Sequence, residues 1–257
     1  MIPSYYRTPE ALVEELGLLE PEDIDVEAIA QYCGATIVYE PLTGCAARLI
    51  GYKDRAIITV DRRATRPRQR FSAMHELGHW MLDRGKACVI CTEQMFGSYT
   101  GEAESRSNRY AGNILLPSEM FSSRAEKLEM TFGTVRRLAE AFQTSLTSTA
   151  FRLVELGSFP AMLVCSAKGW RRWFHRGPRV PEDLWPCDQP GQESVAFKLH
   201  AGAQAADRPA DVGAENWVTH PRSRLYMVRE HSVRIMDGIV LSLIWWKDQE
   251  QLVDWAY

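Results

Sequence analysis

The sequence predicts an α+β fold, with a mixed N-terminal part, then a pair of helices, then a smaller part that is mainly β. Three observations lead to this prediction. A helical segment that follows Thr65 carries apolar residues at spacings of three and four. Ahead of it, residues 35–61 hold three β-rich runs divided by turn residues. After Gly157 the pattern changes to strand-like runs separated by Pro- and Gly-rich links.

Two short helices open the chain. The first is predicted from Pro9 to about Leu19, because Thr8 can cap it and Pro suits its first position. The second is predicted from residue 26 to about residue 33, with Asp25 as its cap and Gly34 as its end.

Strands are expected over residues 35–40, 46–52 and 55–61, and we predict that they form a small antiparallel sheet. Within the last run, Ile57–Val60 is expected at an edge of this sheet, beside the cleft next to the helix that follows. An extended peptide can add to such an edge through main-chain hydrogen bonds. Ile58 and Val60 are therefore candidate substrate-binding residues. The alternative is a strand that is paired on both sides.

The motif His75-Glu76-x-x-His79 lies in the helix that follows. Residues four apart share one face of a helix, so the two imidazoles can bind one metal ion, with Glu76 beside it. Zinc with three protein ligands keeps a position for water and lowers the pKa of that water to about 7. A neighbouring carboxylate can take the water's proton and pass it to a leaving amine. The motif predicts metal-assisted amide hydrolysis; the alternative is a structural pair of histidines.

A third ligand is needed, and we expect it on a later helix within residues 101–117. There Glu104, Asn108 and Ala111 share one face. At this point the chain resembles the ImmA/IrrE family of zinc metallopeptidases. One family helix reads Arg-Phe-Thr-x-Ala-His-Glu-Leu-Gly-His, and residues 70–79 here read Arg-Phe-Ser-Ala-Met-His-Glu-Leu-Gly-His. The other reads Glu-x-x-x-Asn-x-Phe-Ala-x-x-Leu-Leu-x-Pro, and residues 104–117 follow it with Tyr for Phe and Ile for the first Leu.

The resemblance covers roughly residues 8–157 and implies a zincin-like metallopeptidase core with one zinc ion per chain. It implies that His75, His79 and Glu104 bind the zinc and that Glu76 is the general base; Glu102 is the second choice for the third ligand. Similar proteins cleave transcriptional repressors of the XRE type. The resemblance therefore implies regulatory proteolysis in a stress response or during mobile-element induction.

Two residues near the third ligand depart from the family pattern. The family commonly has an acidic residue and an Ala where this chain has Arg106 and Ser107. Neither position is a ligand, but a change here can alter the groups that surround the ligands.

A different class of function is a non-proteolytic regulator with a structural zinc site, which acts by binding DNA or a partner protein. The helices expected at 131–142 and 146–156 have helix-turn-helix proportions. Two stretches are rich in cations: Arg62, Arg63, Arg66, Arg68 and Arg70, and, interleaved with aromatic residues, Lys168, Trp170, Arg171, Arg172, Trp173, His175, Arg176 and Arg179. Nucleic-acid binding is possible but is not favoured, because the net charge is −3.

At 257 residues the chain exceeds a typical single domain. We predict a zinc peptidase domain over 1–128, a helical extension over 129–157, and a mainly β, sensor-like domain over 158–257. Strands of the last part are expected at 161–166, 170–174, 195–199, 225–229 and 239–246.

The remaining signals concern location and cysteine chemistry. No signal peptide is visible, and no stretch approaches the roughly 20 apolar residues of a membrane span. Six cysteines without a disulfide-framework spacing suggest a cytoplasmic protein with reduced thiols. Cys88-x-x-Cys91 is best explained as inert thiols; a redox pair or a structural metal site are the alternatives. The sequence gives no indication of oligomeric state.

Overall fold

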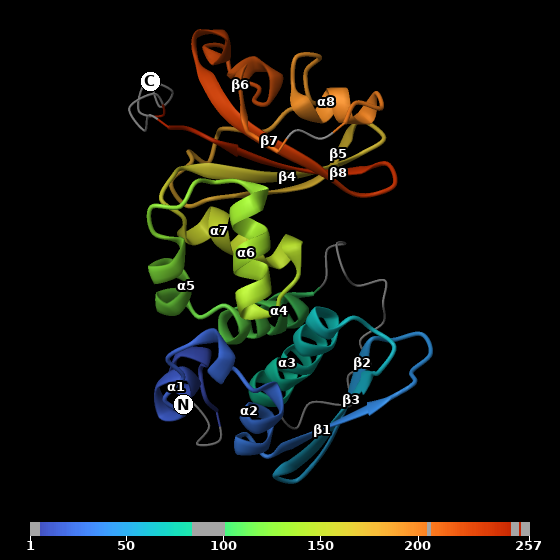
Figure 1. Ribbon diagram of the computed structural model, residues 1–257. Helices are drawn as coiled ribbons and strands as arrows, with labels where there is room; N and C mark the ends of the chain where they lie inside the picture. The colour runs from blue at the N-terminus through green and yellow to red at the C-terminus, as the bar shows by residue number, and fades with distance from the viewer. Residues whose placement is uncertain (1–5, 84–100, 205–206, 248–251, 253–257) are drawn as a thin grey trace. The chain divides into compact units, whose positions relative to one another are not determined.

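The computed structural model describes residues 6–83, 101–204, 207–247 and 252, and it has the predicted α+β fold (Figure 1). The chain divides into two compact units, one made of residues 1–121 and 139–145 and the other of residues 122–138 and 146–257. The predicted domain boundaries at 128 and 157 stay a prediction. No helix in the described part of the chain is long and apolar enough to cross a bilayer.

The elements of the first unit are α1 (Pro9–Glu15), η1 (Pro21–Asp23), α2 (Val26–Tyr32), β1 (Ala35–Glu40), β2 (Ala47–Tyr52), β3 (Arg55–Asp61), α3 (Arg66–Leu82) and α4 (Glu102–Leu115). The division between the units passes through α5 (Ser118–Ala125) and α6 (Phe132–Phe142). The elements of the second unit are α7 (Leu146–Leu156), β4 (Ala161–Ala167), β5 (Trp170–Arg176), α8 (Val195–His200), β6 (Ala210–Gly213), η3 (Ala214–Asn216), η4 (Ser223–Leu225), β7 (Met227–Met236) and β8 (Ile239–Trp245).

The first helices begin where their capping residues predict. The Thr8 hydroxyl accepts a hydrogen bond from the backbone N–H of Ala11 at 3.1 Å. Asp25 caps α2 by accepting two backbone N–H groups of its first turn. Helix α1 ends at Glu15, earlier than predicted, and Gly17 follows with a φ of 62°, a left-handed conformation that often follows helix ends. Thr65 takes the cap position of α3, but its side chain makes no capping hydrogen bond.

The N-terminal sheet has the strand order β1-β3-β2. Strand β2 pairs with β3 antiparallel, whereas β1 pairs with β3 parallel, so the prediction of an antiparallel sheet was wrong for β1. The prediction that Ile57–Val60 lies at an edge was also wrong, because β3 is the central strand. The alternation of apolar residues specifies which face of a strand is buried, but it does not specify strand order or direction.

Ile58 and Val60 consequently lie in the core. Both residues are fully buried on β3, which contacts α3. Their assignment to substrate binding therefore loses its basis.

Helix α3 packs on β2 and β3 through a close contact between Gly51 and Trp80. A Cβ atom at position 51 would lie 2.5 Å from the Trp80 ring, so only glycine leaves room for the indole there. The indole Nε1 donates a hydrogen bond to the carbonyl of Cys33 at 3.0 Å. This packing fixes the part of α3 that carries the histidine motif.

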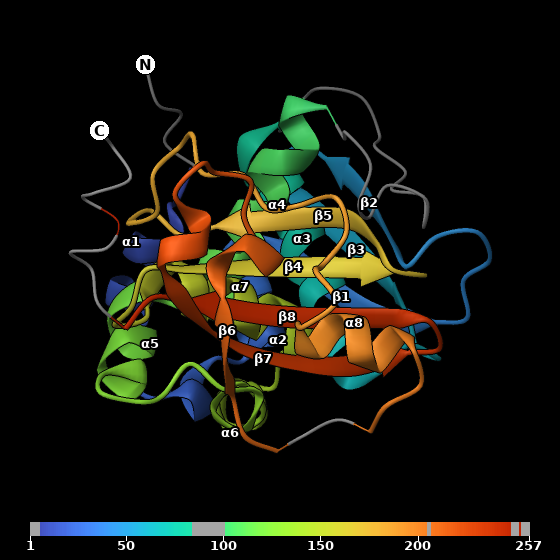
Figure 2. The same cartoon turned by 90° about the horizontal axis from the view of Figure 1, so that it is seen from above.

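The second unit is built on a five-stranded antiparallel sheet in the order β5-β4-β8-β7-β6. Helix α8 covers one face, over β7 and β8, and α7 packs against β4 and β5 on the other (Figures 1 and 2). The mainly β prediction is confirmed. However, residues 195–199, predicted as a strand, form α8, and the short strand β6 was not predicted.

A buried carboxylate explains why residues 195–200 are helical. Glu230 on β7 is fully buried and accepts the backbone N–H groups of Val195 and Ala196 at 2.9 and 2.7 Å. It also accepts the indole N–H of Trp217 at 2.9 Å and the hydroxyl of Ser232 at 2.7 Å. The carboxylate thus satisfies N–H groups that the first turn of a helix leaves without partners.

Candidate metal centre

Three side chains that the sequence marks as metal ligands lie together in the first unit. The Nε2 atoms of His75 and His79 are 3.2 Å apart. The two carboxylate oxygens of Glu104 lie 3.2 Å from His75 Nε2 and 3.1 Å from His79 Nε2. All three residues are buried, and they form a group that could hold a metal ion.

Helix geometry and one small residue bring the group together. His75 and His79 are one turn apart on α3, and α4 packs along α3. The helices approach closely at Gly78, where a Cβ atom would lie only 3.0 Å from the Cα atom of Ser107. A larger residue at position 78 would push α4 away. The Glu104 carboxylate reaches both rings because the helices lie this close.

The spacing of the donor atoms fits a zinc ion. Zinc binds His nitrogen and carboxylate oxygen at about 2.0–2.2 Å with tetrahedral geometry. Two ligands of one tetrahedral ion are then about 3.3–3.6 Å apart, by simple geometry from those bond lengths. The observed separations of 3.1–3.2 Å are shorter by only a few tenths of an ångström. Two imidazoles and one carboxylate are also an established ligand set of catalytic zinc.

The histidine charge state suits metal binding. Burial, the largest cause, and the nearby His79 ring together lower the pKa of His75 to about 4, although Glu104 and a hydrogen bond with Asn108 act in the opposite direction. The His75 ring is therefore neutral at pH 7. A neutral imidazole offers a nitrogen lone pair to a metal.

The other two acidic candidates occupy different environments. Glu76, which precedes His79 by three residues on α3, is fully buried. The side chain of Glu102 is 88% exposed and lies 3.8 Å from Arg106, outside the group of three. The structure therefore places Glu104, the first choice, with the histidines.

Sequence reasoning missed one carboxylate next to this group. Asp83 Oδ2 lies 3.4 Å from His79 Nδ1, the ring nitrogen that faces away from Glu104. The sequence did contain a signal for it, because Asp83 follows His79 by four residues, the spacing that places two side chains on the same face of a helix. A carboxylate behind a ligating histidine is a common feature of zinc sites.

The cationic stretches are largely engaged within their own units. In the first unit the contacts are Arg63 with Asp61, Arg66 with Glu27, and buried Arg70 with the Ile24 carbonyl. In the second unit they are Arg171 with Asp188, Arg176 with the Leu184 carbonyl, and Arg179 with the Ser158 carbonyl. At least six of the ten arginine and lysine side chains in the two stretches therefore have partners within the protein. Cys88 and Cys91 lie outside the described residues.

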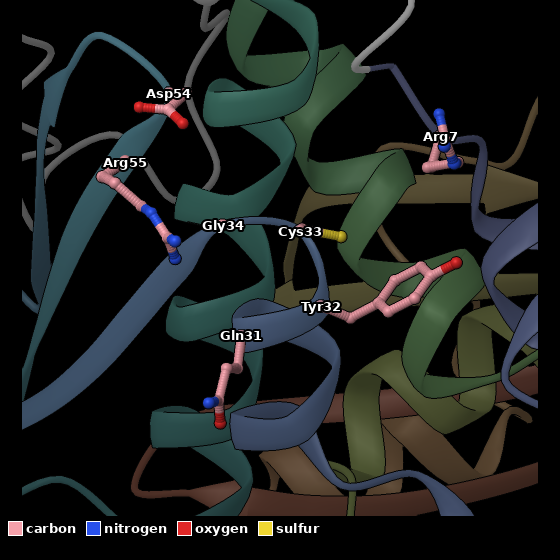
Figure 3. A pocket seen from close by; sticks show the side chains of 7 residues that line it. All are labelled: Arg7, Gln31, Tyr32, Cys33, Gly34, Asp54 and Arg55. Carbon is pink, nitrogen blue, oxygen red and sulfur yellow. The ribbon is translucent and has the colours of Figure 1, made fainter.

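A polar hollow lies elsewhere on the first unit (Figure 3). It is lined by Arg7, residues 31–34, Asp54 and Arg55. None of the predicted metal ligands lines it. It is therefore separate from the group of two histidines and Glu104.

Replacing Ser107 by Ala is expected to raise the free energy of unfolding by about 1 kcal/mol. The Ser107 hydroxyl is fully buried and makes no hydrogen bond to any described group. Alanine removes this unsatisfied group and keeps the Cβ atom that touches Gly78. Urea unfolding measures the change, with S105A, an exposed position on α4, as the control. A loss of stability in S107A alone would contradict the expectation.

Comparison with known proteins agrees with this geometry. Residues 30–154, which contain α3 and α4, match the family described as Peptidase_M78, the IrrE N-terminal-like domain. A solved structure titled "Mycobacterium tuberculosis transcriptional regulator" has a TM-score of 0.57 at 15% identity and covers 92% of this chain and 74% of that chain. At this identity the likeness establishes a shared fold only. No curated protein matches the sequence. The resemblance of the chain to the ImmA/IrrE family is thus confirmed over residues 30–154, which match the IrrE N-terminal-like domain.

Proposed function

We propose that this protein is a zinc-dependent endopeptidase that hydrolyses a peptide bond in a protein substrate. His75, His79 and Glu104 bind one zinc ion, and Glu76 is the general base. The convergence of two imidazoles and one carboxylate, all buried and 3.1–3.2 Å apart, carries this proposal. The match of residues 30–154 to a peptidase family supports it.

The protein's own residues supply binding and proton transfer. A bound zinc ion keeps a position open for water and lowers the pKa of that water. The Glu76 carboxylate takes one proton from the attacking water as its oxygen bonds to the peptide carbonyl carbon. Glu76 then gives that proton to the leaving nitrogen as the C–N bond breaks.

The substrate would pair with β2 rather than β3. In the described part of the chain, β2 is an edge of the N-terminal sheet, and its Gly51 lies against Trp80, the neighbour of His79 in sequence. An extended peptide can add to an edge strand through main-chain hydrogen bonds. Ile50 and Tyr52 on β2 are more than half exposed and are available to contact substrate side chains.

The substrate class rests on the family resemblance. We propose a transcriptional repressor of the XRE type, cleaved in a stress response or in mobile-element regulation. A repressor encoded next to this protein's gene is the first one to test.

Purified protein is expected to contain one zinc ion per chain and to cleave its repressor. Elemental analysis measures the metal, and electrophoresis measures cleavage. A chelator should abolish cleavage, and added zinc should restore it. H79A, which removes one ligand, should bind zinc at least about 100-fold more weakly and should not cleave. A protein that binds no zinc, or that cleaves equally well with chelator, would refute the proposal.

A non-proteolytic regulator is the second candidate. The solved structure that shares the fold is titled a transcriptional regulator. This hypothesis expects E76Q to keep the biological output and R136Q or R171Q to lose it. It also expects a DNA gel shift that weakens steeply with salt, since phosphate contacts depend on counterion release.

A further inference from the structure

The carboxylate of Asp83 lies between the metal centre and a guanidinium group. One oxygen, Oδ2, is 3.4 Å from His79 Nδ1. The other oxygen, Oδ1, is 3.2 Å from the NH2 nitrogen of Arg106. Only 9% of the Asp83 side chain is exposed, so its charge is largely removed from water. A carboxylate in this position needs charged or hydrogen-bonding partners.

These contacts connect the same two helices that supply the metal ligands. Asp83 directly follows α3, four residues after His79, and Arg106 lies on α4, two residues after Glu104. The contacts that join the two helices include His79 with Glu104 at 3.1 Å and Asp83 with Arg106 at 3.2 Å. The first involves the ligands themselves. The second contact holds Asp83, which lies behind the proposed ligand His79.

We propose that Arg106 is a positioning residue that acts through Asp83 on His79 and so raises the affinity of the centre for zinc. This inference rests on the proposed zinc site. Groups that hydrogen-bond to the second nitrogen of a ligating histidine fix its tautomer and its ring orientation. Here Asp83 keeps Nε2 directed at Glu104, and Arg106 fixes the orientation of the Asp83 carboxylate. A guanidinium suits this task because it is always charged and is planar.

The side chain of Arg106 is 44% exposed, so water screens part of its effect. We therefore expect a smaller effect from Arg106 than from Asp83.

The test compares zinc dissociation constants, measured by competition with a chromophoric chelator. D83N is expected to weaken zinc binding about 10- to 100-fold, and R106Q about 3- to 10-fold. R109Q, which removes an exposed arginine from the same helix, is the matched control and should bind zinc like the wild type. The double variant D83N/R106Q should bind no more weakly than D83N, because Arg106 acts through Asp83.

Two further readouts separate positioning from a general loss of structure. The melting temperature of metal-free R106Q should match that of R109Q. The visible absorption spectrum of the Co²⁺-loaded protein should differ between R106Q and R109Q, because it reports ligand geometry. Wild-type binding by R106Q, or additive effects in the double variant, would overturn the inference and leave the proposed function intact. A wild-type protein that binds no zinc would overturn both.

Discussion

Replacing Glu76 by Gln is expected to leave one zinc ion per chain and to lower the cleavage rate by about 10²- to 10⁴-fold. Glutamine has nearly the same shape as glutamate, so the fully buried site should accept it. It cannot take a proton from water at neutral pH, and the proton transfer to the leaving nitrogen is lost with it. The zinc content is expected to persist because Glu76 is not one of the three ligands in the group. Single-turnover cleavage and elemental analysis on one sample measure both quantities.

E102Q is the matched control for this experiment. It makes the same chemical change on α4, at a side chain that is 88% exposed. Both its zinc content and its cleavage rate should equal those of the wild type. If E76Q cleaves as fast as E102Q, Glu76 is not the general base. If E76Q loses its zinc, the carboxylate has a structural or ligating role instead.

Replacing Glu230 by Gln is expected to lower the free energy of unfolding of the second unit by about 2–5 kcal/mol. The two carboxylate oxygens of Glu230 accept four hydrogen bonds, and the Glu230 side chain is fully buried. An amide replaces one acceptor oxygen with an NH2 group, so two of the donors then face a donor. Each buried donor without a partner costs about 1–3 kcal/mol. Typical domains are stable by about 5–15 kcal/mol, so this loss is large.

Urea unfolding followed by tryptophan fluorescence measures the change, since buried Trp217 is one of the donors. D211N is the control: Asp211 is an exposed carboxylate on β6 that pairs with Arg229, and its loss should change stability by less than about 1 kcal/mol. Zinc affinity should stay at the wild-type value in both variants, because the ligands belong to the first unit. Equal stability of E230Q and D211N would refute the structural role of Glu230.

The elements that local signals define were predictable from the sequence. Caps and apolar spacing located α2 and α3, because those signals act within one helix turn. The spacing of His75 and His79 implied that they share a helix face. The third ligand required more, because nothing local relates Glu104 to a helix 25 residues earlier. The resemblance to a family supplied that link.

The features that the sequence did not reveal depend on long-range contacts. Residues 195–199 have a strand-like composition, but they are helical because Glu230, more than 30 residues later, accepts their N–H groups. Strand alternation could not show that β3 is central, since a central and an edge strand can bury the same face. The contact between Asp83 and Arg106 was missed for a similar reason. It exists only once α3 and α4 have packed together.

The parallel position of β1 has a consequence for the order of folding. Strands β2 and β3 are joined by the two-residue turn Lys53–Asp54, in which Lys53 has a φ of 53°, so this hairpin can form from local contacts alone. Strand β1 precedes the hairpin, yet in the described part of the chain it pairs only with β3. A parallel strand cannot dock before its partner has taken shape, and closing the longer loop is slower. Of the three strands of this sheet, we therefore expect the first in sequence to pair last.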